Sequence, residues 1–286
     1  MNNNKLLIID LSNFIFRAFY GVKPLFNKNK EQTNAIHGVA NMFLNLLKQT
    51  HPSHVIIARD SKERKERKDL FEEYKGNRSA MPDELKNQIE PILKMFNLMN
   101  VCQLEVGGQE ADDVIGTLVN KEKNNFQSIF IASSDKDLMQ LIEDNVYLFD
   151  SMKNILYNDE RVFDKFGVLP KQMIDYLALV GDKSDNVPGV QGIGPKSASK
   201  LLTDYTDFDG IYINLDNIKS KSTQEKLTIN KNNGVLSKKL VTINQDLELD
   251  YDLNCCSTSI SLNDELESFL DYYDLSYIKQ RILSEN

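Results

Sequence analysis

Cysteine is scarce in this chain, and long apolar runs are absent. The 286 residues include three cysteines, Cys102, Cys255 and Cys256. Their spacing is not that of metal ligands, and the adjacent pair is poorly placed for a disulfide bond. Such usage favours a reducing, cytoplasmic environment. No apolar run approaches the roughly 20 residues that a membrane span requires. Residues 6–9 are apolar, but Asp10 follows at once, which predicts a strand rather than a signal peptide.

A positive net charge is also lacking. The chain has 42 acidic and 34 basic residues, and its net charge of −8 argues against a protein that simply coats nucleic acid. Basic patches that grip phosphate remain compatible with this total, because a cluster of acids that holds divalent cations makes the net charge negative. The hydrophobic content of 41% and charged content of 27% are those of a globular protein. The length fits one large domain or two.

Short apolar runs alternate with helical patterns in the first part of the chain. The runs predict buried strands at residues 5–10, 54–60 and 128–137. The helical patterns cover residues 35–49, 83–97 and 111–122. Strands that alternate with helices predict an α/β domain with a largely parallel sheet. Ser12 is expected to cap the helix that follows the first strand.

Beyond residue 168 the pattern becomes helical, with a turn rich in glycine and proline. We therefore expect an α/β domain at residues 1–168 and a helical region at residues 169–286. The segment GVQGIGPKSASK has the character of a helix–hairpin–helix turn, in which glycines and a helix N-terminus approach a phosphate. Its candidate DNA-binding residues are Gly192, Gly194, Lys196 and Lys200. A plain tight turn is the alternative. Residues 214–234 are expected to be solvated helix and loop, and the last stretch one or two amphipathic helices.

Residues 107–122 crowd Glu110, Asp112 and Asp113 before an apolar helical pattern. Acids favour the first turn of a helix, because the macrodipole is positive there. That preference accounts for one acid, but three like charges destabilise one another unless a cation lies between them. Sites in parallel sheets form beyond the carboxyl ends of the strands, where Asp10, Asp60 and Asp135 stand. The two patterns together suggest a cation site at the sheet edge.

The acids in such positions are nine in number, at strand ends, at the start of a helix or in a loop. They are Asp10, Asp60, Glu110, Asp112, Asp113, Asp135, Asp137, Asp182 and Asp185. Mg²⁺ and Mn²⁺ prefer oxygen ligands, whereas zinc prefers histidine and cysteine, which are missing here. The set predicts two divalent cations about 3.5–4 Å apart that clamp a phosphodiester. Two of these acids also have an alternative role when each is considered alone. Asp137 fits the cap of a helix, and Asp185 fits a turn.

Residues 59–79 hold eight basic and six acidic residues, a composition typical of a solvated helix. The end of this run suggests more, because Lys75 and Arg78 precede a loop and are able to reach a phosphate. Tyr74 offers a face on which a base stacks. Arg17 follows Asp10 by one or two helical turns and is expected on the same side.

These motifs resemble, nearly from end to end, the 5′-nuclease (5′→3′ exonuclease, flap endonuclease) domain of bacterial DNA polymerase I and the related phage 5′-nucleases. The segments that carry the resemblance are LLIIDLSNFIFRAFY, LFEEYKGNR, EADDVIGTL, SSDKDLMQL and LVGDKSDNVPGVQGIGPKSASKLL. The resemblance implies a PIN-like α/β nuclease domain followed by a helix–hairpin–helix (H3TH) region. The implied activity is divalent-metal-dependent hydrolysis of DNA near 5′ flaps, overhangs and nicks, in replication and repair.

The resemblance also implies residue roles. One metal would lie mainly among Glu110, Asp112, Asp113, Asp135 and Asp137, with Asp10 and Asp60 nearby. The other metal would be bound mainly by Asp182 and Asp185. Residues matching Arg17, Lys75 and Arg78 contact the scissile phosphate region in the family. The hairpin, residues 192–196, would hold the duplex backbone, with a potassium ion. A monomer is expected, with a DNA polymerase as a further partner.

Two departures from the family pattern lie near the second strand. Arg59 and Glu66 stand where the family usually carries aromatic residues, which affects the segment over the site but none of the nine acids. Two other functions were weighed. A non-catalytic DNA-junction binder would have lost acids, and a PIN-type ribonuclease would lack the helix–hairpin–helix region. The resemblance fits both a stand-alone nuclease and the first domain of a polymerase.

Overall fold

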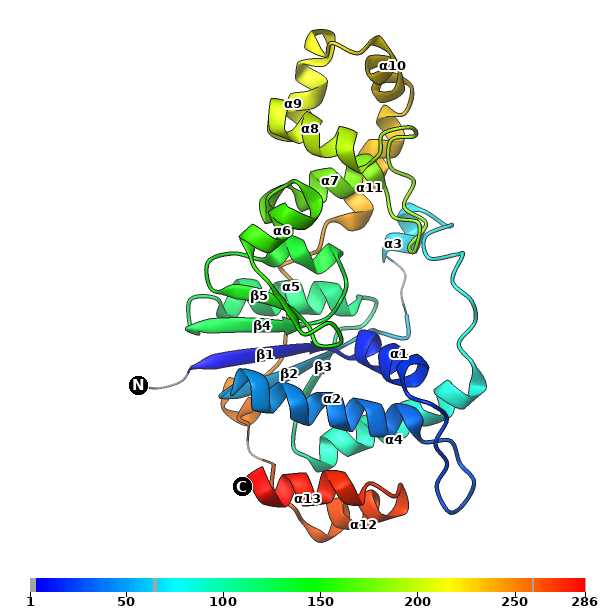
Figure 1. Cartoon of the computed structure of the whole chain (residues 1–286), viewed down its shortest axis with the longest axis vertical. Coiled ribbons are helices and arrows are strands. Elements are labelled where there is room, and N and C mark those ends of the chain that lie inside the picture. The colour runs from blue at the N-terminus through cyan, green and yellow to red at the C-terminus, as the bar shows by residue number, and fades with distance from the viewer. Residues whose placement is uncertain (1–3, 64–65, 259, 286) are drawn as a thin grey trace.

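The computed structural model describes residues 4–63, 66–258 and 260–285. Its centre is a six-stranded sheet in the order β3-β2-β1-β4-β5-β6 (Figure 1). The strands are β1 Lys5–Asp10, β2 His54–Arg59, β3 Cys102–Glu105, β4 Ser128–Ala132, β5 Val146–Asp150 and β6 Ile155–Tyr157. All neighbours pair in parallel except β5 and β6. The predicted α/β class with a largely parallel sheet is confirmed, while β3, β5 and β6 had no prediction.

The central strands are apolar on both faces because both faces are covered. Ile8 of β1 is opposite Ile56 of β2 and Ile131 of β4, and all three side chains are buried. This register brings the carboxyl ends of β1, β2 and β4 to one edge of the sheet. β4 ends at Ala132, so Asp135 follows in the loop beyond that edge.

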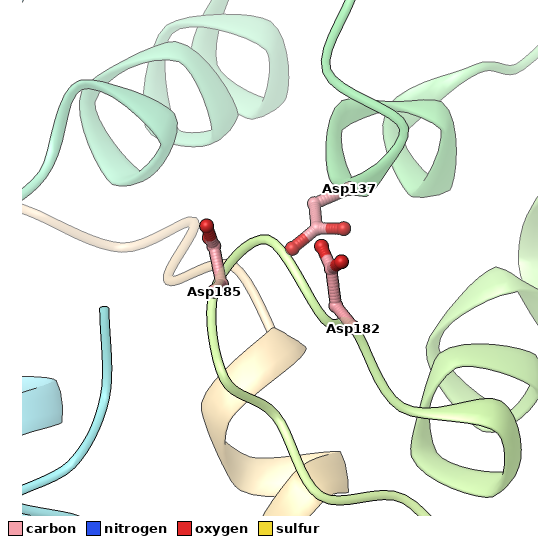
Figure 2. A group of neighbouring side chains, drawn as sticks. All are labelled: Asp137, Asp182 and Asp185. Atoms are coloured by element: carbon pink, nitrogen blue, oxygen red, sulfur yellow. The ribbon is translucent and has the colours of Figure 1, made fainter. Parts of the chain in front are cut away.

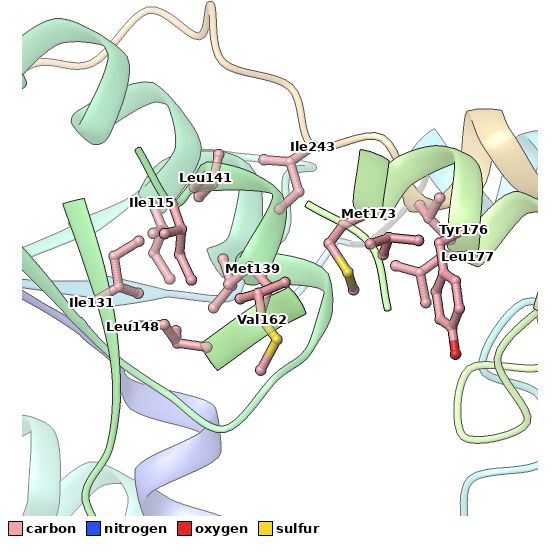
Figure 3. Packing of buried hydrophobic residues seen from close by; sticks show 14 of the residues in the cluster. Ile115, Ile131, Met139, Leu141, Leu148, Val162, Met173, Tyr176, Leu177 and Ile243 are labelled. Carbon is pink, nitrogen blue, oxygen red and sulfur yellow. The ribbon is translucent and has the colours of Figure 1, made fainter. Parts of the chain in front are cut away.

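Helices cover the sheet in two layers (Figure 1). One layer contains α1 Leu11–Gly21, α2 Asn34–Thr50 and α4 Asp83–Leu98, which pack with the last two helices. The other contains α5 Ala111–Glu122 and the short helix η1 Asp137–Leu141, against which α7 Met173–Val180 of the helical region packs. Figure 3 shows the second core, in which Ile115 of α5 and Ile131 of β4 lie close to Met139. The three predicted helices correspond to α2, α4 and α5.

The start of α1 differs from the prediction. Asp10, not Ser12, is the N-cap, because its carboxylate accepts a hydrogen bond of 3.1 Å from the backbone N–H of Asn13. The hydroxyl of Ser12 instead donates to Asp60 at the end of β2. A cap that is also a strand-end acid is fixed in direction, which matters for the site.

The helical region rises from one end of the sheet domain (Figure 1). Besides α7, it contains α6 Asp159–Phe166, η2 Pro170–Gln172, α8 Pro195–Tyr205, α9 Phe208–Ile213, η3 Leu215–Asn217, α10 Lys221–Ile229 and α11 Lys231–Val241. After α11 the chain returns along α5 through residues 242–252 and reaches η4 Leu253–Cys256. A short helix, α3 Glu66–Leu70, lies in the segment between β2 and α4.

The chain ends with α12 Asp264–Tyr272 and α13 Ser276–Glu285, which pack against α4 and α2 of the sheet domain rather than on the helical region (Figure 1). His37 of α2 contacts the backbone carbonyl of Tyr273 at 3.0 Å, and Arg281 donates to Asn41 and Asn45. The division at residue 168 stays a prediction, with the qualification that α12 and α13 lie against the first domain. In the part of the chain that the structure describes, no helix combines the length and apolarity needed to cross a membrane.

Candidate metal centre and nucleic-acid interface

The candidate site lies where β1 and β4 run side by side. The chain leaves β1 toward the layer of α1 and leaves β4 toward the layer of η1, so the two connections diverge. Open parallel sheets form their binding crevices at such a switch point. A cleft of about 610 Å³ opens there, and Asp10, Asp60, Asp112 and Asp135 line it together with Lys75.

Asp10 is the acid closest to the sheet. Its carboxylate is buried and accepts hydrogen bonds from Ser133 Oγ at 2.8 Å and from the backbone of Asn13. Burial first, and the neighbouring Asp60 second, raise the pKa of Asp10 to about 7. Asp60 is fixed by Ser12 and by the backbone N–H of Ala111 at 3.1 Å. Asp10 and Asp60, at the ends of β1 and β2, therefore lie close enough for their negative charges to repel each other.

The start of α5 separates its three acids. Burial, then Asp135, raises the pKa of Asp112 well above its ordinary value. Glu110 is the N-cap residue, and its Oε2 accepts from Arg67, Tyr74 and Lys75. Asp113 points to other partners, since both of its oxygens bind the Arg67 guanidinium and one also accepts from the backbone of Asn244. Its carboxylate is occupied, so the structure gives Asp113 an anchoring role where a metal ligand was predicted.

A second group of acids contains Asp137, Asp182 and Asp185. One carboxylate oxygen from each lies within 4.8 Å of the others, and all three residues are buried. Figure 2 shows Asp137, at the start of η1, facing Asp182, with Asp185 further along the same loop as Asp182. Asp137 was predicted to share an ion with the α5 acids, and the structure brings its carboxylate to Asp182 and Asp185, because the turn after Asp135 carries its side chain toward the loop that follows α7.

The pKa shifts of this second group differ in sign. Burial first, then Asp135, raises the pKa of Asp137 well above its ordinary value. Burial also raises the pKa of Asp135, which lies between the two groups and also senses Asp185 and Asp182. Burial alone would raise the pKa of Asp182. The ammonium of Lys136 at 2.9 Å and the hydrogen bonds from Ser184 outweigh burial, so the pKa of Asp182 is lowered.

Four basic side chains surround the acids. Lys75 lies 2.9 Å from Glu110 and 3.7 Å from Asp185, which bridges the two groups. Arg78 pairs with Asp185, and Lys136 with Asp182. Arg17 lines the cleft but pairs with Asp150 at 2.9 Å. Positive groups able to meet a phosphate thus stand beside the acids.

Tyr74 differs from the prediction. The residue is 4% exposed, its hydroxyl donates to Glu110 at 3.1 Å, and its ring lies beneath the Lys75 ammonium, 5.0 Å from the ring centre. A buried ring offers no open face to a base in this structure. The tyrosine supports Glu110 and Lys75 instead.

Divalent cations fit these acids. The Oδ1 atom of Asp137 is buried and has no hydrogen-bond partner among the described residues. Burial first, and neighbouring acids second, raise the pKa values of Asp10, Asp112, Asp135 and Asp137, and a bound cation would offset both effects. All donors are carboxylate oxygens, which suit Mg²⁺ or Mn²⁺. Asp10, Asp60, Asp112 and Asp135 would hold one ion, and Asp135, Asp137, Asp182 and Asp185 the other.

The hairpin between α7 and α8 directly continues the second acid group. The backbone of Asp182 exchanges two hydrogen bonds with Val187, of 2.9 and 2.7 Å. Gly192 has a φ of +82°, which favours glycine, and Gly194 is the N-cap of α8. Lys196 and Lys200 are exposed on α8. A backbone turn that ends at a helix N-terminus beside free lysines is suited to phosphate.

Arg67 and Lys136 are functional candidates that the sequence analysis missed. Arg67 belongs to the charged run at residues 59–79, in which residues 64–65 lie outside the described residues. Nothing in the local pattern marks it, because its partners come from residues 110–113 and 240–242, which are distant in the sequence. Lys136 stands between Asp135 and Asp137, and a cation inside an acidic motif is a signal that was available.

Two family models cover this chain in succession. Residues 5–167 match the 5′-3′ exonuclease, N-terminal resolvase-like domain, and residues 168–263 match the 5′-3′ exonuclease, C-terminal SAM fold. The chain therefore belongs to the 5′-3′ exonuclease family.

Curated relatives agree with the family models. A DNA polymerase I of Caldicellulosiruptor bescii is 43% identical over 98% of this chain and 34% of its own length. A 5′-3′ exonuclease of Aquifex aeolicus is 38% identical, over 86% of this chain and 83% of its own length. The chain thus spans about a third of the polymerase relatives and most of the exonuclease.

Solved structures share the fold. A crystal structure of the T5 D15 protein with metal ions has a TM-score of 0.69 at 20% identity and covers 98% of both chains. The catalytic core of Rad2 in complex with DNA substrate has a TM-score of 0.63 at 16% identity and covers 96% of this chain and 91% of its own. The predicted PIN-like domain and helical region are confirmed at the level of fold.

Proposed function

We propose that this chain is a structure-specific 5′→3′ exonuclease and flap endonuclease that hydrolyses DNA phosphodiesters near 5′ ends. The observation that carries the proposal is the set of buried, unbalanced acids at the switch point, faced by Lys75 and Arg78. The substrates are DNA with a 5′ flap, a 5′ overhang or a nick. The family and the named nuclease relatives support this choice.

The acids are proposed to hold two divalent ions, Mg²⁺ or Mn²⁺. Such ions supply Lewis acidity to a phosphodiester and lower the pKa of water. Asp10 and Asp60 are fixed by hydrogen bonds before any ion binds, so their oxygens need little rearrangement. The unpartnered Oδ1 of Asp137 would gain its missing contact.

Lys75 and Arg78 are proposed to hold the scissile phosphate in line. They now pair with Glu110 and Asp185, and an arriving phosphate would replace those carboxylates as their partner. Arg17 would join them from α1 after leaving Asp150. No side chain acts as a covalent nucleophile, so water is the attacking group.

The hairpin is proposed to hold the duplex. Gly192 and Gly194 would let the backbone approach a phosphate, with a potassium ion as a further ligand of this turn, and Lys196 and Lys200 would add charge. We further propose that the protein acts as a monomer in the cytoplasm and that a DNA polymerase, fused or separate, uses its product.

The first test is cleavage of a 5′-labelled DNA flap in Mg²⁺ and in EDTA. Short labelled products that need Mg²⁺ are the expected result. A single-stranded RNA of the flap sequence, incubated in parallel, is expected to remain intact.

Two outcomes would overturn the proposal. Binding of the flap without cleavage, across a range of Mg²⁺ and Mn²⁺ concentrations, would indicate a junction-binding protein. Faster cleavage of the RNA than of the flap would indicate a ribonuclease.

A further inference from the structure

Arg67 uses every donor of its side chain, although it lies in a charged run that predicted a solvated helix. It belongs to α3, and its side chain is 11% exposed. The five N–H groups have five acceptors: Leu240 O at 2.8 Å, Thr242 O at 3.2 Å, Glu110 Oε2 at 3.2 Å, and the two carboxylate oxygens of Asp113 at 2.7 and 2.8 Å. A largely buried guanidinium whose five N–H groups all donate hydrogen bonds indicates a structural contact between segments rather than a solvated surface charge.

The acceptors come from two separate parts of the chain. Glu110 and Asp113 belong to the start of α5 and lie 1% to 7% exposed at their side chains. Leu240 and Thr242 are at the end of α11, where backbone carbonyls have no partner within the helix. Arg67 therefore joins the segment over the cleft, the acids of α5 and the last turn of α11.

The other side of α11 holds the hairpin. The Ser237 hydroxyl accepts a hydrogen bond of 2.8 Å from the backbone N–H of Gly189, and it is buried. Lys238 lies 2.9 Å from Asp175 of α7. A continuous set of contacts thus runs from the hairpin through α11 and Arg67 to Glu110 at the cleft.

We infer that Arg67 is a positioning residue that fixes the distance between the hairpin and the metal-binding acids, and so selects which phosphate is cut. The inference rests on the proposed function. Arg67 contacts no group that would react, because it acts through Glu110 and Asp113, which flank Asp112, the proposed metal ligand in the first turn of α5. Lysine keeps the charge but has only three donors on one atom, so it cannot join all five acceptors. Arg67→Lys therefore changes the geometry at nearly constant charge.

The test compares Arg67→Lys with Arg59→Lys. Arg59 is a matched control, because it ends β2 in an ion pair of 2.8 Å with Glu105 and does not line the cleft. Single-turnover cleavage of a labelled flap is mapped at single-nucleotide resolution, and the melting temperature of each variant is measured. We expect Arg67→Lys to cut about 10- to 100-fold more slowly, as for other residues that support metal ligands, and to distribute its cuts over neighbouring phosphates. The control is expected to keep both rate and position.

Either of two results would overturn the inference. One is wild-type rate and position in Arg67→Lys. The other is a slower reaction with an unchanged cut position, which would assign Arg67 a merely structural role.

A second measurement separates this inference from the proposed function. Titration calorimetry with Mn²⁺ alone is expected to show about tenfold weaker binding in Arg67→Lys than in the wild type, and no change in the control. If the wild type binds Mn²⁺ but leaves the flap intact, the proposed function fails, while the difference in Mn²⁺ affinity still tests the support of the acids. Equal Mn²⁺ affinity in both proteins would contradict that support.

Discussion

The carboxyl edge of the sheet and the hairpin segment, residues 181–196, both bring acids to the candidate site, but they balance the charge differently. At the edge, burial and neighbouring acids raise the pKa values of Asp10, Asp112 and Asp135. In the hairpin segment, Lys136 lowers the pKa of Asp182 against the effect of burial, and Asp185 pairs with Arg78 and Lys75. In the hairpin segment, basic side chains of the chain itself pair with the acids. At the sheet edge, Asp10, Asp112 and Asp135 have fewer such partners.

This difference separates two tasks. An edge with unbalanced acids attracts ions from solution, so it is suited to the chemical step. A segment whose acids pair with Lys75, Arg78 and Lys136 presents Lys196 and Lys200 to solvent, so it is suited to holding a polyanion while Asp182 and Asp185 serve the second ion. Four variants test whether the two regions divide the work in this way.

Asp135→Asn should have the largest effect, because Asp135 lies between both acid groups. The amide keeps the shape but removes one negative charge. We expect flap cleavage in Mg²⁺ to fall about a thousandfold, the upper range for loss of one electrostatic group, with flap binding retained. Single-turnover rates and a binding titration measure the two quantities. Asp144→Asn, at an exposed acid, is the control. A wild-type rate would remove Asp135 from the metal ligands.

Asp182→Ala should have a smaller effect. Its partner Lys136 remains and continues to offset the charge of Asp137, so the rest of the group keeps its structure. We expect a loss of about 10- to 100-fold in cleavage rate, partly restored by more Mg²⁺. The rate is measured across a Mg²⁺ series, with Asp204→Asn of α8, an exposed acid, as control. A loss larger than that of Asp135→Asn would reverse the comparison between the regions.

Asp10→Asn tests whether the Asp10 carboxylate at the sheet edge destabilises the fold when it is charged. The measured quantity is the pH dependence of stability. Since folding raises the pKa of Asp10 from 3.8 to about 7, the unfolded state binds fewer protons than the folded state within that window. The stability of the wild type in EDTA should therefore fall as pH rises from about 4 to about 7, by at most roughly 1.4 kcal/mol per pH unit from this group.

The variant carries no charge at this position, so its advantage in melting temperature over the wild type should grow across the same window. Mg²⁺ should reduce the advantage at pH 7. Melting temperatures at pH 4.5, 5.5 and 7 measure it. An advantage that does not change with pH would show that Asp10 has an ordinary pKa.

Lys196→Ala should have the smallest effect and should act on binding alone. Removing one phosphate contact should lower the slope of log affinity against log salt by about one unit. The cleavage rate at saturating enzyme should stay unchanged. Lys94→Ala is the control, because Lys94 is an exposed residue of α4, in the other layer of the sheet domain. An unchanged slope would exclude Lys196 from the phosphate contacts.

The sequence predicted the acidic edge of the sheet well because parallel strands impose it. Three apolar runs that end near an aspartate can meet only at one edge of a parallel sheet, so the positions of Asp10, Asp60 and Asp135 follow from the pattern. β3 and β6 were missed because they have four and three residues, too few for a pattern. β5 has five residues, as many as β4, and its run VYLF ends at Asp150 as the run of β1 ends at Asp10, so its signal was present in the sequence and was overlooked.

Side-chain direction was harder to predict. Asp112 and Asp113 are consecutive on a helix and point about 100° apart, so only one of them faces the other acids. Helical geometry alone would have raised that question. The partners of Arg67 and the burial of Tyr74 depend on residues more than 30 positions away, and no local pattern contains that information.

The return of α12 and α13 to the sheet domain has a consequence for synthesis of the protein. Leu266, Phe269 and Ile278 complete a core whose other members come from α1, α2 and α4 and from the sheet. During synthesis, that apolar face stays uncovered until residues 264–285 have been made, after the whole helical region. A fragment cut after residue 263, where the second family match ends, would expose the face permanently and should aggregate. Two helices that follow the helical region in the sequence therefore complete the core beside the sheet.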